Sequence, residues 1–225
     1  MHRRDTASVI RIAARSARVD VDGRPGADLL VDGGTVEVQP DGTVDVATGS
    51  GRVRVVCADH ATVVVSTTSG KVNVRGTVAD VRVITQSGTV QVDRTVDADL
   101  RTSSGGVRVG VSAGTCRVVT TSGAVRVEEA HELHVAAGSS RVEIGSVEVA
   151  SIRTVSGTVR VGTVATGRLD VSTMSGKVGV RVPVGTAATA RLRSRSGRIV
   201  NQVPEGEGST LDVATSSGVI EVVWA

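Results

Sequence analysis

The chain has 225 residues and a formal net charge of +3, and it contains no Phe, no Tyr and a single Trp, Trp224. A net charge this small says little about partners, so any argument about charge must come from where the charged residues lie. A core without aromatic side chains cannot readily fill the roughly 10 Å between two packed sheets. The composition therefore argues against a wide β-sandwich and favours a narrow core of Val, Thr and Ala.

The first residues, Met1 to Thr6, carry basic side chains and lead directly to Ile10. They lack the apolar run of about 7 to 15 residues that a secretory signal peptide needs. The apolar runs elsewhere are far shorter than the roughly 18 residues of a transmembrane helix. We therefore expect a cytoplasmic protein, and peripheral association with a membrane stays open.

From Ile10 onward one pattern returns, Thr-x-Ser-Gly-x-Val-x-Val with substitutions, as in the stretch from Thr85 to Val92. Apolar residues lie six and four positions before the serine, and three and five after it. This period of two predicts strands with one buried face. The change of phase at Ser-Gly predicts a tight corner in which the glycine has a positive φ angle. The reference position occurs twelve times, at spacings of 17 to 21 residues: Ser16, Gly33, Ser50, Ser69, Ser87, Ser104, Ser122, Ser139, Ser156, Ser175, Ser196 and Ser217.

The repeats differ in how closely they follow the pattern. The first obeys it, the second (Ala27 to Val38) is degraded and flanked by turn residues, and residues 44–180 are regular. The last two returns are longer and contain prolines, which predicts bulging loops. Trp224 shares the parity of the last apolar residues, and we expect it to cover the open end of the final repeat.

These observations predict an all-β protein built as a single parallel β-solenoid (β-helix) of about twelve coils of 17–21 residues. The expected organisation is one domain, residues 1–225, with an N-terminal cap in about 1–15 and a C-terminal cap in about 219–225. Parallel crossovers favour a right-handed coil, and a left-handed coil of hexapeptides is the alternative. Stacking should place hydroxyl side chains in a ladder two residues before the serine: Thr48, Thr67, Thr85, Thr102, Thr120, Thr154, Thr173, Ser194 and Thr215.

The repeated Thr-x-Ser-Gly-x-Val-x-Val units are followed by a Val-Pro-x-Gly-Thr loop at Val182 to Thr186 and by Arg195-Ser196-Gly197-Arg198-Ile199. With these features the sequence resembles a bacterial β-strand-repeat family of adhesin-like proteins, a domain of unknown function. The likeness covers almost the whole chain. It implies a repetitive β-solenoid without a known catalytic centre, and it transfers no functional residues.

The sequence offers little catalytic chemistry. His131 and His134 flank Leu133, a core position, so they have opposite parity and are not expected to bind one metal ion. The Ser-Gly pairs recur too regularly to be a single strained nucleophile. Cys57 and Cys116 lie on apolar stretches and are expected to be small core residues, too far apart for a disulfide. We therefore predict no enzyme activity, no catalytic or metal site, no cofactor and no small-molecule substrate.

One set of charged residues stands above the background. The outward positions two and four residues after the serine, from the third to the eleventh repeat, hold nine basic residues against one acid, Glu143. We call these nine residues the basic set: Arg52, Arg54, Lys71, Arg108, Arg126, Arg141, Arg160, Lys177 and Arg198. They are either a solvated strand face that discourages edge pairing or a docking surface for an extended anionic partner.

Two functions remain open from the sequence. The first is a non-enzymatic binding or scaffold protein, adhesin-like, whose basic set binds an anionic polymer, an anionic surface or an acidic protein. The lack of Phe and Tyr, with Trp224 as the single Trp, leaves no row of aromatic side chains for bases to stack on and argues against recognition of single-stranded nucleic acid. The second is a self-assembling, bactofilin-like structural polymer.

Overall fold

The computed structural model describes residues 2–4, 9–164 and 167–225, and the strands account for almost all of them. The strands are β1 (His2–Arg4), β2 (Val9–Arg24), β3 (Leu29–Asp32), β4 (Thr35–Val38), β5 (Val44–Ala58), β6 (Thr62–Thr163), β7 (Arg168–Val182), β8 (Ala187–Asn201) and β9 (Gly208–Trp224). No helix occurs among the described residues, so none is available there to cross a membrane. The fold is all-β, as the period of two predicted.

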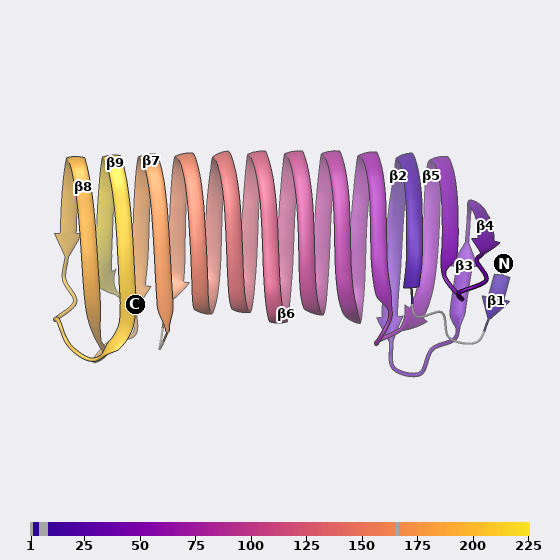
Figure 1. The fold of residues 1–225 in the computed structure, drawn as a ribbon, viewed down its shortest axis with the longest axis horizontal. Helices are drawn as coiled ribbons and strands as arrows, with labels where there is room; N and C mark the ends of the chain where they lie inside the picture. The colour runs from indigo at the N-terminus through magenta and orange to yellow at the C-terminus, as the bar shows by residue number, and fades with distance from the viewer. Residues whose placement is uncertain (1, 5–8, 165–166) are drawn as a thin grey trace. The chain divides into compact units, whose positions relative to one another are not determined.

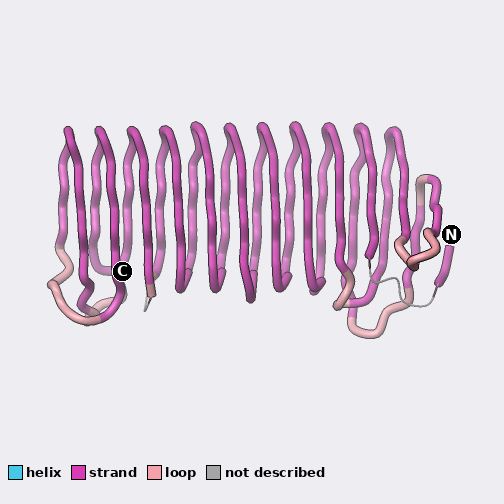
Figure 2. Tube along the Cα trace, viewed as in Figure 1, coloured by secondary structure: helices cyan, strands magenta, loops and turns pink. Residues whose placement is uncertain are grey.

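The chain divides into two compact units, Met1–Ala113 and Gly114–Ala225, and the long strand β6 runs through both. Short loops connect the strands within each unit (Figure 2). The expectation of one domain stays a prediction, as do the number of coils and their hand. The units are therefore described one at a time.

In the first unit, strand order does not follow the sequence. β2 pairs in parallel with β5 on one side and with the start of β6 on the other, so it lies between two later strands (Figure 1). Both pairings keep the predicted register, because Ser16 lies opposite Ser50 and also opposite Ser69. Residues 9–15, expected in an N-terminal cap, therefore belong to a strand with neighbours on both sides.

The strands of the degraded second repeat run antiparallel to β5, whereas the sequence predicted a parallel coil. β3 and β4 both pair antiparallel with β5, and β1 pairs antiparallel with β3. The reason is local: β4 turns directly into β5 through Gln39 to Thr43, where Gly42 has a φ of 83° and its N–H donates to the Gln39 carbonyl. The expected parallel coil at this repeat is wrong.

In the second unit, the last strand is also placed out of sequence order. β9 pairs in parallel with β7 and with β8, while β8 pairs with β9 alone among the described strands (Figure 1). Trp224 lies opposite Val182 of β7 and is half-buried. The edge strand is thus β8, which exposes Ile199, and Trp224 does not cover the final repeat as expected.

The core confirms the predicted alternation. Val, Ile and Leu at the four inward positions of each regular repeat are buried, as Val107 and Val109 are around the outward Arg108. The corner glycines have the predicted positive φ angles, for example 154° at Gly88 and 141° at Gly176. The Ser-Gly corner therefore changes the phase of the alternation, as the sequence indicated.

The hydroxyl ladder forms only in part. The Oγ1 atoms of Thr154 and Thr173 are 3.0 Å apart, as expected of neighbours in a ladder. The more common partner is the carbonyl of the corner serine two residues on, as for Thr67, Thr102 and Thr120, at 3.0 to 3.1 Å. These hydroxyls therefore mostly donate to the backbone of their own corner.

Both cysteines are free and buried, as predicted. Burial raises the pKa of the Cys116 thiol to about 12, and burial together with the charge of Asp22 raises the pKa of Cys57 to about 11. The thiolate is the reactive form, so we expect neither cysteine to react with a thiol-specific disulfide reagent at pH 8 in the folded protein. Two thiols should react after urea unfolding, and absorbance of the released thiolate counts them. Fast labelling of the folded protein would contradict this burial.

Candidate functional site

The basic set lies on outward positions in both units. Period-two alternation sends the third and fifth residues after the serine into the core, so the second and fourth point out. All nine side chains are exposed except Lys71, which is half-buried. The structure thus places every predicted residue on a strand surface, where each could contact a partner.

In the first unit, strand β2 lies between β5 and β6 and adds a basic residue, Arg18, that belongs to the first repeat and so was outside the basic set. Arg18, two residues after Ser16, lies opposite Arg52, and Ser16 itself lies opposite Ser69. Arg18 thus joins this surface between the repeats of Arg52 and Lys71. The sequence could have identified Arg18, because it lies two residues after Ser16 just as Arg52 lies two residues after Ser50.

The same strand also brings in an acid. Asp20 is nearly buried, and its Oδ2 accepts from the Arg52 Nε at 2.7 Å and from the Arg18 Nε at 3.0 Å. Its Oδ1 accepts from the Asn73 Nδ2 at 2.7 Å. Burial alone would raise the pKa of Asp20, but the hydrogen bonds from Asn73, Arg52 and Arg18 outweigh it and hold that pKa below its ordinary value. Asp20 is therefore an ionised centre that neutralises part of the basic surface.

The second unit shows the same kind of neutralisation. Glu143, the one acid at these positions, lies 3.6 Å from Arg126 and 3.7 Å from Arg160. Glu221 comes from the inserted strand β9 and lies 2.7 Å from Lys177. These exposed pairs contribute little to stability, but they reduce the positive charge that a partner would meet.

Ion pairs with neighbouring acids neutralise part of the basic set, which the sequence alone did not indicate. Four of the nine, Arg52, Arg126, Arg160 and Lys177, contact a carboxylate. Within the described residues the other five form no ion pair: Arg54, Lys71 and Arg108 in the first unit, and Arg141 and Arg198 in the second. Binding to an anionic partner would depend mainly on these five.

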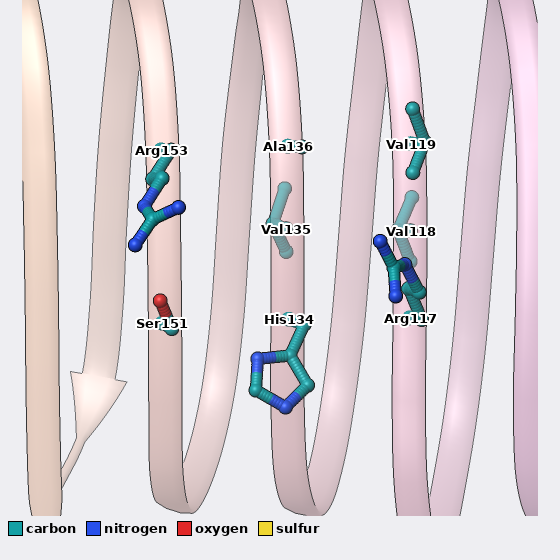
Figure 3. Close-up of a pocket in the computed structure, with 8 residues that line it drawn as sticks. All are labelled: Arg117, Val118, Val119, His134, Val135, Ala136, Ser151 and Arg153. Carbon is teal, nitrogen blue, oxygen red and sulfur yellow. The ribbon is translucent and has the colours of Figure 1, made fainter.

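A second basic surface lies in the second unit, on the strand face before the corner. Arg117, His134 and Arg153 come from three consecutive repeats and line one pocket, with His134 between the two arginines (Figure 3). The His134 Nε2 lies 3.0 Å from the Glu132 Oε1. His131 instead contacts Glu148 at 2.9 Å, so the two histidines have different carboxylate partners. The described residues contain no group of three or more metal-ligating side chains.

The sequence comparison adds a family match to this geometry. Residues 35–133 match the Toastrack DUF4097 family model. The Toastrack match covers less than half of the chain, from β4 into the part of β6 that lies in the second unit. It includes Arg52, Arg54, Lys71, Arg108 and Arg126 of the basic set. No curated protein and no solved structure matches the chain.

Proposed function

We propose that the protein is a non-enzymatic β-solenoid that binds an extended anionic partner through the exposed cations of the basic set. Parallel pairing of regular repeats in one register, together with the Toastrack match, supports the solenoid. The right-handed coil remains part of this proposal, and the second repeat, whose strands pair antiparallel, is not counted among the coils.

The observation that carries the proposal is the distribution of charge. Nine of the ten charged residues at these outward positions are basic, and five of the nine have no ion pair in the described structure. Parallel neighbours lie about 4.8 Å apart, so like charges on adjacent strands repel one another, by up to roughly 1 kcal/mol per close pair in water. An anionic partner would relieve this repulsion.

The test is binding at two salt concentrations to four defined probes: double-stranded DNA, anionic lipid vesicles, poly-glutamate and a polyglycerol-phosphate polymer. Binding should weaken steeply with salt, because cations that neutralise phosphates release counterions. If the DNA binds, changing Lys71→Gln and Arg108→Gln together should reduce the slope of log K against log salt by about 2, since each contact with a DNA phosphate contributes about 0.9. For the other probes the same double change should also reduce the slope.

The matched control is Arg75→Gln with Arg94→Gln, which removes the same charge from the first unit at exposed residues outside the basic set. The control should bind like the wild type. Lack of binding to all four probes at low salt, or equal losses in the two double variants, would show that the basic set is only a solvated face.

A second candidate, self-assembly through strand edges, gains support from β8. Among the described strands this edge strand pairs on one side only, and it exposes Ile199. Such an edge can add a further strand. Its four arginines, Arg191, Arg193, Arg195 and Arg198, oppose pairing with a second copy of β8. Sedimentation velocity at micromolar concentration distinguishes the candidates, because growing filaments would favour the structural polymer.

A further inference from the structure

A pocket of about 330 Å³ interrupts the strand face before the corner in the second unit. Ala136 is one of the residues that line it, and the outward neighbours of Ala136 at the same repeat position are the larger Val119 and Arg153. A small side chain between two larger ones leaves a hollow on the strand surface, and Figure 3 shows Ala136 on the strand between those that carry Val119 and Arg153. The hollow therefore follows from three residues at the same position in successive repeats, Val119, Ala136 and Arg153, each 17 residues from the next in the sequence.

The hollow is bordered by cations. Arg117 and Arg153 are both exposed, and neither guanidinium forms an ion pair with a carboxylate in the part of the chain that the structure describes. His134 lies between them and contributes an imidazole, and Ser151 contributes a hydroxyl (Figure 3). Four polar groups that can donate hydrogen bonds thus border one small cavity.

The neighbouring acids do not occupy this cavity. The two Glu132 oxygens are held by His134, at 3.0 Å, and by the Thr115 hydroxyl, at 3.2 Å. Because Glu132 contacts the His134 Nε2, the Nδ1 is the ring nitrogen left for a ligand, and it donates a hydrogen bond only when the ring carries both protons. Asp170 lies opposite Ser151 in the sheet register and does not line the pocket.

We propose that this pocket binds a small phosphomonoester. Guanidinium groups bind phosphate through paired N–H donors, so Arg117 and Arg153 would hold the phosphate from two sides. The Ser151 hydroxyl is a further donor, and His134 donates from Nδ1 in its doubly protonated form. The organic part of the ligand would lie over Val119 and Ala136, which supply an apolar surface. This site is on a different strand face from the basic set and does not depend on the polyanion proposal.

The experiment follows the imidazole proton resonances by NMR at pH 7.5, where a phosphomonoester with a second pKa near 6 is a dianion. Phenyl phosphate should shift the His134 resonance in a saturable way and leave those of His60 and His131 unchanged. Inorganic phosphate should shift the same resonance but bind about tenfold more weakly, because it buries no apolar surface. Benzoate carries a carboxylate in place of the phosphate, so its affinity tests whether the pocket selects phosphate.

Three variants make the test specific. Arg153→Gln should weaken phenyl phosphate at least about tenfold, because it removes a charge-assisted contact. Ala136→Leu should abolish binding by filling the hollow while leaving every charge in place. Arg168→Gln, in the same unit but outside the pocket lining, should bind like the wild type, and far-UV circular dichroism confirms that each variant is folded.

Several results would overturn the assignment. One is an unchanged His134 resonance, or equal shifts of His60, His131 and His134. Another is a loss of affinity in Arg168→Gln as large as that in Arg153→Gln, which would indicate a diffuse charge effect. Benzoate binding as tightly as phenyl phosphate would rule out selection for phosphate.

Discussion

Changing Gly176 to alanine should lower the free energy of unfolding by more than about 3 kcal/mol. Gly176 has a φ of 141°, and an added Cβ would lie 2.0 Å from the carbonyl oxygen of Gly157 on the neighbouring strand. Neither backbone can move away easily, because Gly176 also pairs with Gly218 on its other side. In a protein of this size the melting temperature should fall by more than roughly 6 °C.

Thermal unfolding followed by circular dichroism and by the fluorescence of the single tryptophan measures this effect. The matched control is Gly179→Ala on the same strand, where φ is not in the positive range and an added Cβ meets nothing within 4 Å. The control should change stability by no more than about 0.5 kcal/mol. Similar losses of unfolding free energy in the two variants would mean that the close approach of the corner glycines is not the reason that Gly176 cannot be replaced.

Changing Asp20 to asparagine should destabilise the protein by about 2 to 3 kcal/mol at pH 7. The change removes a nearly buried carboxylate that accepts hydrogen bonds from Arg18, Arg52 and Asn73. It also leaves the guanidinium groups of Arg18 and Arg52 close together without the negative charge that offsets their repulsion. The variant should bind a polyanion more tightly than the wild type, because Arg18 and Arg52 are released.

The effect of Asp20 should depend on pH in a defined direction. The pKa of Asp20 is lowered in the folded state, so its contribution is present above the unfolded value of about 3.9 and is lost as pH falls through the folded value. Urea unfolding should therefore show a large difference between wild type and variant at pH 7 and a small one in strong acid. The control Asp22→Asn, whose side chain contacts Arg24, should cost less than about 1 kcal/mol.

The local fold could be predicted from the sequence, but the order of strands could not. Alternation and the Ser-Gly corner depend on neighbouring residues, so they could be seen in every regular repeat. Strand order depends on which repeats pair, and the repeats are nearly equivalent: the register of Ser16 suits Ser50 and Ser69 equally well. The pattern therefore determined how repeats pair but not which ones become neighbours.

The same limit applies to the candidate sites. The outward positions of the basic set follow from parity alone, and the structure exposes all of these side chains except the half-buried Lys71. Their ion pairs with Asp20 and Glu221 depend on the inserted strands β2 and β9, so they were not predicted. The pocket beside His134 needs three side chains from successive repeats to be compared in size, which a search for motifs within one repeat does not do.

The placement of β2 and β9 has a consequence for how the chain folds. β2 is synthesised before both of its neighbours, so one of its edges stays unpaired until residue 58 of β5 is available and the other until residue 76 of β6 is available. β8 likewise has no strand partner until β9 follows it and enters between β7 and β8. Folding cannot proceed by adding one repeat after another in order of synthesis. Two edges must wait for later segments, and during that delay they are open to pairing with other chains.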